Sequence, residues 1–126
     1  MARGRKMILL VDDEEVIRTI VSRVLRDEGF EVITAGTMQE AFRAAVDHGN
    51  RIRLAIVDLQ MADGSGWDVA AQIWRQCPET NVLIASGSLT EAPPEDLPVP
   101  EGQLHFLSKP FQMGDLVRTV TALIER

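Results

Sequence analysis

Hydrophobic positions follow two patterns that alternate along the chain. Short continuous runs of valine, leucine and isoleucine are typical of strands buried on both faces of a parallel sheet. Longer stretches, in which apolar residues recur at helical spacing, predict amphipathic helices. The predicted strands cover residues 7–11, 30–35, 54–57, 81–86 and 104–108, and the predicted helices cover residues 14–28, 39–47, 66–76 and 111–126.

The ends of the first two predicted helices carry residues that start or stop a helix. Asp13 and Thr37 are placed to cap the first turns through their side-chain oxygens. Gly29 and Gly49 follow the last apolar residues, where glycine commonly ends a helix. In the second helix we expect the apolar residues up to Val46 to face the core.

The segment between the fourth and fifth predicted strands breaks the alternation. Within residues 89–102 stand Pro93, Pro94, Pro98 and Pro100. Each proline inside a helix removes a hydrogen bond and costs about 3 kcal/mol or more. The sequence therefore predicts a reduced or missing fourth helix, with at most one turn around Pro94–Leu97 and an extended backbone elsewhere.

Strands that alternate with helices predict a doubly wound α/β fold around a five-stranded parallel sheet. The strand order expected for this flavodoxin-like fold, 2-1-3-4-5, places the first and third strands side by side, with a crevice at their carboxyl ends. The length of 126 residues fits a single domain over 1–126, with residues 1–6 as a basic tail.

Composition and charge narrow the classes of partner. The chain is 45% hydrophobic and 25% charged, as is usual for soluble globular proteins. Its 13 basic and 19 acidic residues give a net charge of −6, which argues against nucleic-acid binding. The single Cys77 fits a reducing cytosol, and no apolar run approaches the roughly 20 residues of a membrane span. We therefore expect a cytoplasmic protein without nucleic-acid or membrane partners.

Polar residues stand at the ends of four predicted strands. Asp12 and Asp13 follow the first strand, Asp58 follows the third, Ser86 ends the fourth and Lys109 follows the fifth. Each residue alone has an ordinary explanation as a helix cap, a turn residue or a solvated lysine. At the carboxyl edge of one sheet, however, three carboxylates, a hydroxyl and an amine together suit a divalent cation and a phosphoryl group.

This pattern resembles the receiver (response-regulator) domain of two-component signalling over residues 6–125. The resemblance implies that Asp58 accepts a phosphoryl group from a phosphohistidine of a histidine kinase or a histidine-phosphotransfer domain. It also implies Mg²⁺ as the cofactor. Asp13, Asp58 and the backbone carbonyl of Gln60 would bind the ion directly, and Asp12 would act mainly through a metal-bound water.

The same resemblance assigns the remaining strand-end residues. Lys109 and the Ser86 hydroxyl would hold the phosphoryl oxygens, and Ser86 and Phe106 would form a conformational switch. Pro110 is a candidate for a cis peptide bond, because only proline adopts that bond at low cost. The first helix, within residues 13–28, would be the docking site for the phosphodonor domain.

The chain departs from the usual receiver pattern in the loop after the acceptor. Ala62 stands where a proline is usual, and Ser65 stands where an aspartate is common. With Gly87 after Ser86, the sequence resembles receivers attached to hybrid kinases and some single-domain receivers. We therefore expect the output to pass to a downstream protein partner or to an attached kinase or output domain.

Other classes of protein fit less well. An FMN carrier would need a glycine-rich phosphate loop where the acidic residues 12–15 stand, and a haloacid-dehalogenase-type phosphatase would need a carboxylate at Gln60. The alternative that stays open is a receiver-like interaction module that is not regulated by phosphorylation. A receiver is a signalling domain rather than an enzyme, since it catalyses only its own aspartyl phosphorylation and dephosphorylation.

We interpret Trp67 and Trp74, which lie seven residues apart, as packing residues.

Overall fold

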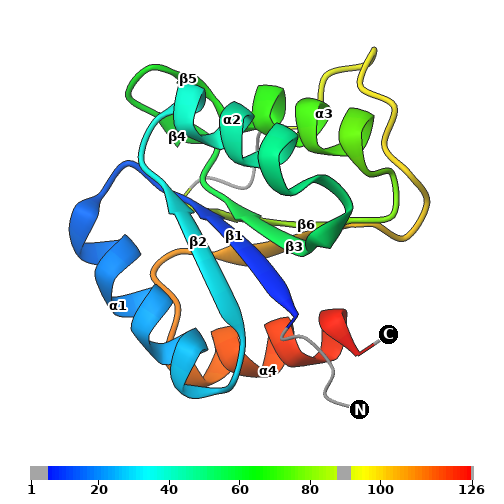
Figure 1. Ribbon diagram of the computed structural model, residues 1–126. Helices are drawn as coiled ribbons and strands as arrows, with labels where there is room; N and C mark the ends of the chain where they lie inside the picture. Colours follow the sequence, from blue (N-terminus) through cyan, green and yellow to red (C-terminus); the bar gives the residue numbers. More distant parts are fainter. Residues whose placement is uncertain (1–5, 88–91, 126) are drawn as a thin grey trace.

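One parallel sheet of five strands forms the centre of the molecule (Figure 1). The computed structural model describes residues 6–87 and 92–125, so most of the predicted basic tail lies outside the described residues. The strands of the sheet are β1 (Met7–Val11), β2 (Glu31–Ala35), β3 (Ile52–Val57), β6 (Asn81–Ser86) and β7 (Leu104–Ser108). Their order, β2-β1-β3-β6-β7, is the predicted one.

A small hairpin lies between β3 and α3 along the chain. It consists of β4 (Gln60–Met61) and β5 (Gly64–Ser65), which pair antiparallel outside the main sheet. The sequence predicts only a loop here, because strands of two residues leave no periodic pattern. The hairpin gives the loop after Asp58 a defined shape.

Helices cover both faces of the sheet. They are α1 (Glu15–Asp27), α2 (Met38–His48), α3 (Gly66–Gln76) and α4 (Met113–Ile124), and the short 3₁₀ helix η1 (Gly49–Arg51) follows α2. Figure 1 shows α1 and α4 on one face and α2 and α3 on the other. An apolar cluster fills the space between the helices and the sheet on each face. The central strands are therefore buried on both sides, which explains why their sequences are continuous apolar runs. None of the helices in the described part of the chain has the length and apolar character needed to cross a membrane.

Several helix ends match the sequence prediction. The Thr37 hydroxyl accepts a hydrogen bond from the backbone N–H of Glu40 at 3.1 Å and so caps α2. Gly29 and Gly49, which follow α1 and α2, have φ angles of 97° and 46°. Those left-handed conformations favour glycine, because it has no Cβ to clash with the backbone.

Two local predictions are wrong. Glu14, rather than Asp13, is the N-cap residue of α1, because the Asp13 carboxylate accepts a hydrogen bond from the loop residue Ala62 instead. Val46 is 58% exposed, whereas we expected it to face the core. The buried position on that turn of α2 is Ala45, and the next residue points about 100° further around the helix.

The proline-containing connection between β6 and β7 has no helix in its described residues. The predicted turn lies at Pro94–Leu97, where the Leu97 N–H donates to the Pro94 carbonyl at 3.0 Å. A second turn, where we expected an extended backbone, lies at Pro100–Gln103, and there the Gln103 N–H donates to the Pro100 carbonyl at 3.2 Å. The missing fourth helix is thereby confirmed for residues 92–103, while the predicted range from residue 89 to residue 91 lies outside the described part. Figure 1 shows this connection, in yellow, passing beside α3.

Candidate functional site

The carboxyl ends of four neighbouring strands meet at one edge of the sheet. The strand register pairs Val11 with Val57, Val57 with Ile84 and Ser86 with Ser108. The polar residues that end or follow these strands therefore lie side by side. This alignment comes from the parallel pairing itself, because parallel strands point the same way.

Three carboxylates form the centre of this edge. Asp12 and Asp58 are buried, with exposed fractions of 2% and 8%, and Asp13 is partly buried. One oxygen from each of the three lies within 4.8 Å of the others. Like charges this close repel one another, and a cation would relieve that repulsion. Hard carboxylate oxygens are the ligands that Mg²⁺ prefers, so the donor set fits this ion.

Backbone N–H groups orient the two buried carboxylates. The N–H of Glu14 donates to Asp12 Oδ1 at 2.9 Å, and the N–H of Gln60 donates to Asp58 Oδ1 at 3.1 Å. Both donors lie two residues after the carboxylate that they hold, as in an Asx turn. The side chain of Gln60 is exposed, and its backbone is held by pairing with Ser65 in the hairpin.

The third carboxylate is held by a contact that sequence analysis missed. The backbone N–H of Ala62 donates to Asp13 Oδ2 at 2.7 Å, from 49 residues further along the chain. Proline, the usual residue at this position in receivers, has no N–H and could not make this bond. The missing proline was the available signal, but only the fold shows which group the freed N–H contacts.

Lys109 joins two of the carboxylates. Its Nζ lies 2.6 Å from Asp12 Oδ2 and 3.2 Å from Asp58 Oδ2. Burial lowers the pKa of the ammonium group, but the hydrogen bond and charge of Asp12, followed by those of Asp58, outweigh it and raise the pKa above the ordinary 10.5. Lys109 is therefore protonated at physiological pH. Its backbone N–H donates to the Ser86 carbonyl at 3.0 Å, and the Lys109–Pro110 peptide bond is cis.

The two predicted switch residues lie on adjacent strands but differ in exposure. Ser86, at the end of β6, is 1% exposed, and Phe106, in β7, is 44% exposed. In the strand register Phe106 lies opposite Ile84, two residues before Ser86. The Phe106 ring makes an edge contact with Trp67 at the start of α3, with ring centroids 6.3 Å apart and planes at 71°.

Arg18, on α1, is a further residue that sequence analysis missed. Its Nη1 donates to the backbone carbonyl of Asp12 at 2.8 Å. A Cβ added to Gly36 would lie 2.7 Å from the same Nη1, so the absence of a side chain at Gly36 leaves room for the guanidinium. Arg18 thus fixes the backbone that presents Asp12 to the site.

Known proteins share both the sequence pattern and the fold. The model of the response regulator receiver domain family matches residues 8–121. Sensor kinase CckA of Brucella abortus is 27% identical over 98% of this chain, and the probable transcriptional regulatory protein TcrX of Mycobacterium tuberculosis is 31% identical over 94%. The chain spans only 13% of the first protein's length and 50% of the second's.

A solved structure of a response regulator has a similar fold. The response regulator TrrA of Thermotoga maritima, crystallised in complex with Mg²⁺-BeF, superposes with a TM-score of 0.78. The two chains are 26% identical, and the match covers 94% of this chain and 98% of that one.

Proposed function

This chain belongs to the response regulator receiver domain family, and from that membership we propose that Asp58 accepts a phosphoryl group from a phosphohistidine donor. The observation that carries the proposal is the position of Lys109 Nζ between Asp12 and Asp58, beside the third carboxylate of Asp13. A cation site and a fixed ammonium group next to one buried carboxylate are the parts that phosphoryl transfer needs.

The proposed reaction transfers one phosphoryl group between two side chains. A carboxylate oxygen of Asp58 attacks the phosphorus atom, and the new O–P bond forms as the N–P bond to the donor imidazole breaks. The bonding electron pair leaves with the imidazole nitrogen, and the product is an acyl phosphate. Lys109 and the Ser86 hydroxyl contact phosphoryl oxygens as negative charge spreads over them.

Mg²⁺ is the proposed cofactor, because the donor set is made of hard oxygen ligands. Asp13, Asp58 and the backbone carbonyl of Gln60 would bind it directly, and Asp12 would act through a metal-bound water. When bound, the ion supplies charge neutralisation for the phosphoryl oxygens. The crystallisation of TrrA with Mg²⁺-BeF supports this assignment.

The proposed partners follow from the two-component family. The phosphodonor is a histidine kinase or a histidine-phosphotransfer domain, and the output passes to a downstream protein or to an attached kinase or output domain. With a net charge of −6, the receiver itself is proposed to contact neither nucleic acid nor membrane, and to act in the cytoplasm. We propose residues 1–126 as one receiver domain.

Phosphorylation is proposed to act through Ser86 and Phe106. The phosphoryl group on Asp58 would draw the Ser86 hydroxyl inward and leave room for the exposed Phe106 ring to turn toward it. The phosphoryl group must bind the two arrangements with different affinity, since a ligand shifts a population only by that difference.

Intact mass spectrometry after incubation with acetyl phosphate and Mg²⁺ tests the assignment. We expect the wild-type chain to gain one phosphoryl group and the Asp58→Ala variant to gain none. Asp68→Asn, which removes an exposed carboxylate on α3, is the matched control and should be phosphorylated normally. EDTA should abolish the gain in every sample.

The alternative function is a receiver-like interaction module that phosphorylation does not regulate. The same experiment separates the two functions. No phosphoprotein in the wild type would favour the alternative. A wild-type yield in Asp58→Ala would show that the assignment of Asp58 as the acceptor is wrong.

A further inference from the structure

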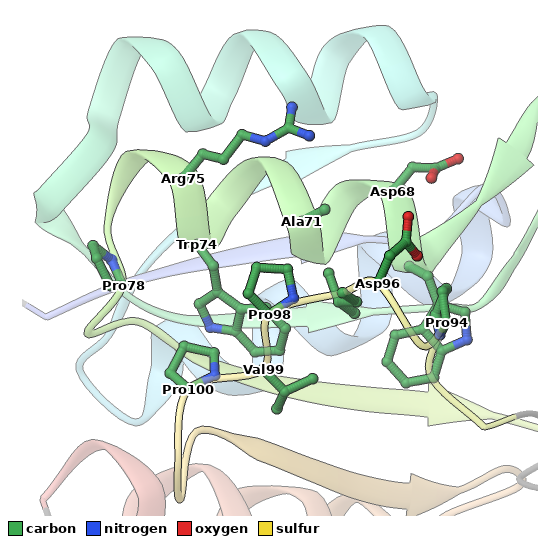
Figure 2. Close-up of a pocket in the computed structure, with 12 residues that line it drawn as sticks. Asp68, Ala71, Trp74, Arg75, Pro78, Pro94, Asp96, Pro98, Val99 and Pro100 are labelled. Atoms are coloured by element: carbon green, nitrogen blue, oxygen red, sulfur yellow. The ribbon is translucent and has the colours of Figure 1, made fainter.

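A cavity of about 620 Å³ lies between α3 and the connection that follows β6. We name residues 92–103 of that connection the proline segment. Figure 2 shows Trp74 of α3 next to Pro98, Val99 and Pro100 of the segment, with Asp68 and Asp96 at the opposite end of the cavity. The segment therefore lies against α3 without the interlocking side chains of two packed helices.

Few interactions hold the proline segment in place. Gln103 Nε2 donates to the Glu79 carbonyl at 2.6 Å, and the Val82 N–H donates to the Gln103 carbonyl at 2.8 Å, so both bonds lie at the end of the segment. Further in, Leu97 packs against the apolar cluster that contains Trp67. A segment with few contacts and few backbone hydrogen bonds opens at a low free energy, so small changes in its support alter its population.

Trp67 connects this segment to the phosphorylation site. It lines the cavity together with Leu97, and its ring makes the edge contact with Phe106. Trp67 also directly follows Gly66, at which an added Cβ would lie 2.3 Å from the Asp58 carbonyl oxygen. The Trp67 side chain, 3% exposed, thus lies beside the switch ring and the proline segment, and its backbone directly follows the residue that approaches the acceptor backbone.

The indole N–H of Trp67 differs from that of Trp74 in its hydrogen bonding. The Trp67 Nε1–H is buried and has no hydrogen-bond partner in the part of the chain that the structure describes. By contrast, Trp74 Nε1 donates to the Thr80 carbonyl at 2.9 Å. A buried donor without an acceptor is costly, which makes a second arrangement of the Trp67 ring competitive with the observed one.

We infer that Trp67 couples the orientation of Phe106 to the packing of the proline segment. When Phe106 turns toward Ser86, its edge contact with Trp67 is lost, the indole ring moves, and Leu97 loses its support against α3. This inference rests on the proposed function, because phosphorylation of Asp58 is its natural trigger. It gives the receiver a regulated surface in which a proline segment takes the place of a helix.

Two NMR readouts test the coupling in the full chain. The two tryptophans give two indole N–H signals, which Trp74→Phe assigns. With acetyl phosphate and Mg²⁺ we expect the Trp67 indole signal to move, while the hydrogen-bonded Trp74 signal stays in place. Amide exchange at Leu97 should become at least about five-fold faster, while exchange at Gln103 should change little.

A second arm tests the coupling without phosphorylation. Phe106→Leu removes the ring contact, so the unphosphorylated variant should show the same Trp67 movement and the same faster exchange at Leu97. Phe30→Leu, which alters a ring packed in the cluster on the other face of the sheet, is the matched control and should leave both readouts unchanged.

Intact mass measured on the same samples separates this inference from the proposed function. A full gain of phosphoryl group with an unmoved Trp67 signal and unchanged exchange at Leu97 would overturn the coupling and leave the proposed function standing. An absence of phosphorylation would contradict the proposed function, and the Phe106→Leu arm would then decide the coupling alone. If that variant behaves like Phe30→Leu, the inference is wrong.

Discussion

At the residue scale, Gly66 sets how closely α3 approaches the acceptor strand. Its N–H donates to the Leu59 carbonyl at 2.8 Å, and an added Cβ would lie 2.3 Å from the Asp58 carbonyl oxygen and 2.9 Å from Leu59 Cα. Those neighbours are backbone atoms, which cannot move aside as a flexible side chain can. The requirement for glycine here is therefore one of space.

Gly66→Ala is expected to lower the free energy of unfolding by about 2–3 kcal/mol, because the backbone must shift to accept the new methyl group. Urea denaturation measures this change. Gly114→Ala is the control, since its Cβ would meet only Arg118 Nη1 at 3.5 Å. That variant should be about 0.5–1 kcal/mol more stable, because alanine is the better helix former. Equal effects of the two substitutions would contradict the close approach at Gly66.

At the element scale, α1 presents apolar side chains to solvent beside the site. Val16 and Ile20 are 66% and 45% exposed and lie four residues apart, so they share one side of the helix. Val21 and Leu25 of α1 are instead buried in the apolar cluster on this face of the sheet. Because α1 begins at Glu15, shortly after the carboxylates of Asp12 and Asp13, this apolar strip starts close to the proposed phosphorylation site.

Val16→Asp and Ile20→Asp are expected to slow phosphotransfer from a phosphorylated histidine-phosphotransfer domain by about ten-fold or more, since each places a charge in an apolar contact. Phosphorylation by acetyl phosphate should be unchanged, because a small donor needs no docking surface. Val46→Asp, at an apolar position of α2 that is 58% exposed, is the matched control. Rapid-quench phosphotransfer assays measure both reactions, and an unaltered rate for the two α1 variants would rule out this face as the docking site.

At the scale of the whole molecule, we expect the carboxylate cluster to make the stability of the fold depend on divalent metal. Three carboxylates share one ammonium group, so the metal-free site carries unbalanced negative charge. Any ion that binds the folded chain more tightly than the unfolded chain stabilises the fold as a whole. We therefore expect the repulsion between the carboxylates to lower the free energy of unfolding of the whole chain when no metal is bound.

Asp13→Asn should weaken this metal dependence. Asparagine keeps an oxygen that can accept from Ala62 but removes one negative charge, so without metal the variant should be about 1 kcal/mol more stable than the wild type. At ten times the dissociation constant, Mg²⁺ should stabilise the wild type by about 1.4 kcal/mol and the variant by much less. Thermal unfolding in EDTA and in Mg²⁺ measures both effects, with Asp47→Asn on α2 as the control carboxylate. A variant that is less stable in EDTA would refute the repulsion.

Much of the fold was predictable because the information is local. Apolar runs marked every strand of the main sheet, helical spacing marked all four helices, and the prolines at positions 93, 94, 98 and 100 predicted the missing helix in residues 92–103. The strand order then followed from the flavodoxin-like, doubly wound fold that this alternation predicts. The polar edge was predictable for the same reason, since each of its residues stands at the end of a strand.

The strands and helices, their topology and the residues of the polar edge can thus be predicted from the amino-acid sequence. The contacts between side chains and backbone groups near that edge depend on how the elements pack: Ala62 with Asp13, Arg18 with the Asp12 carbonyl, and Phe106 with Trp67. These partners are separated by between six and 49 residues along the chain, and no periodic pattern specifies them. Hydrophobic periodicity reports which face of an element is buried, whereas a specific contact depends on the distance and angle at which two packed elements lie.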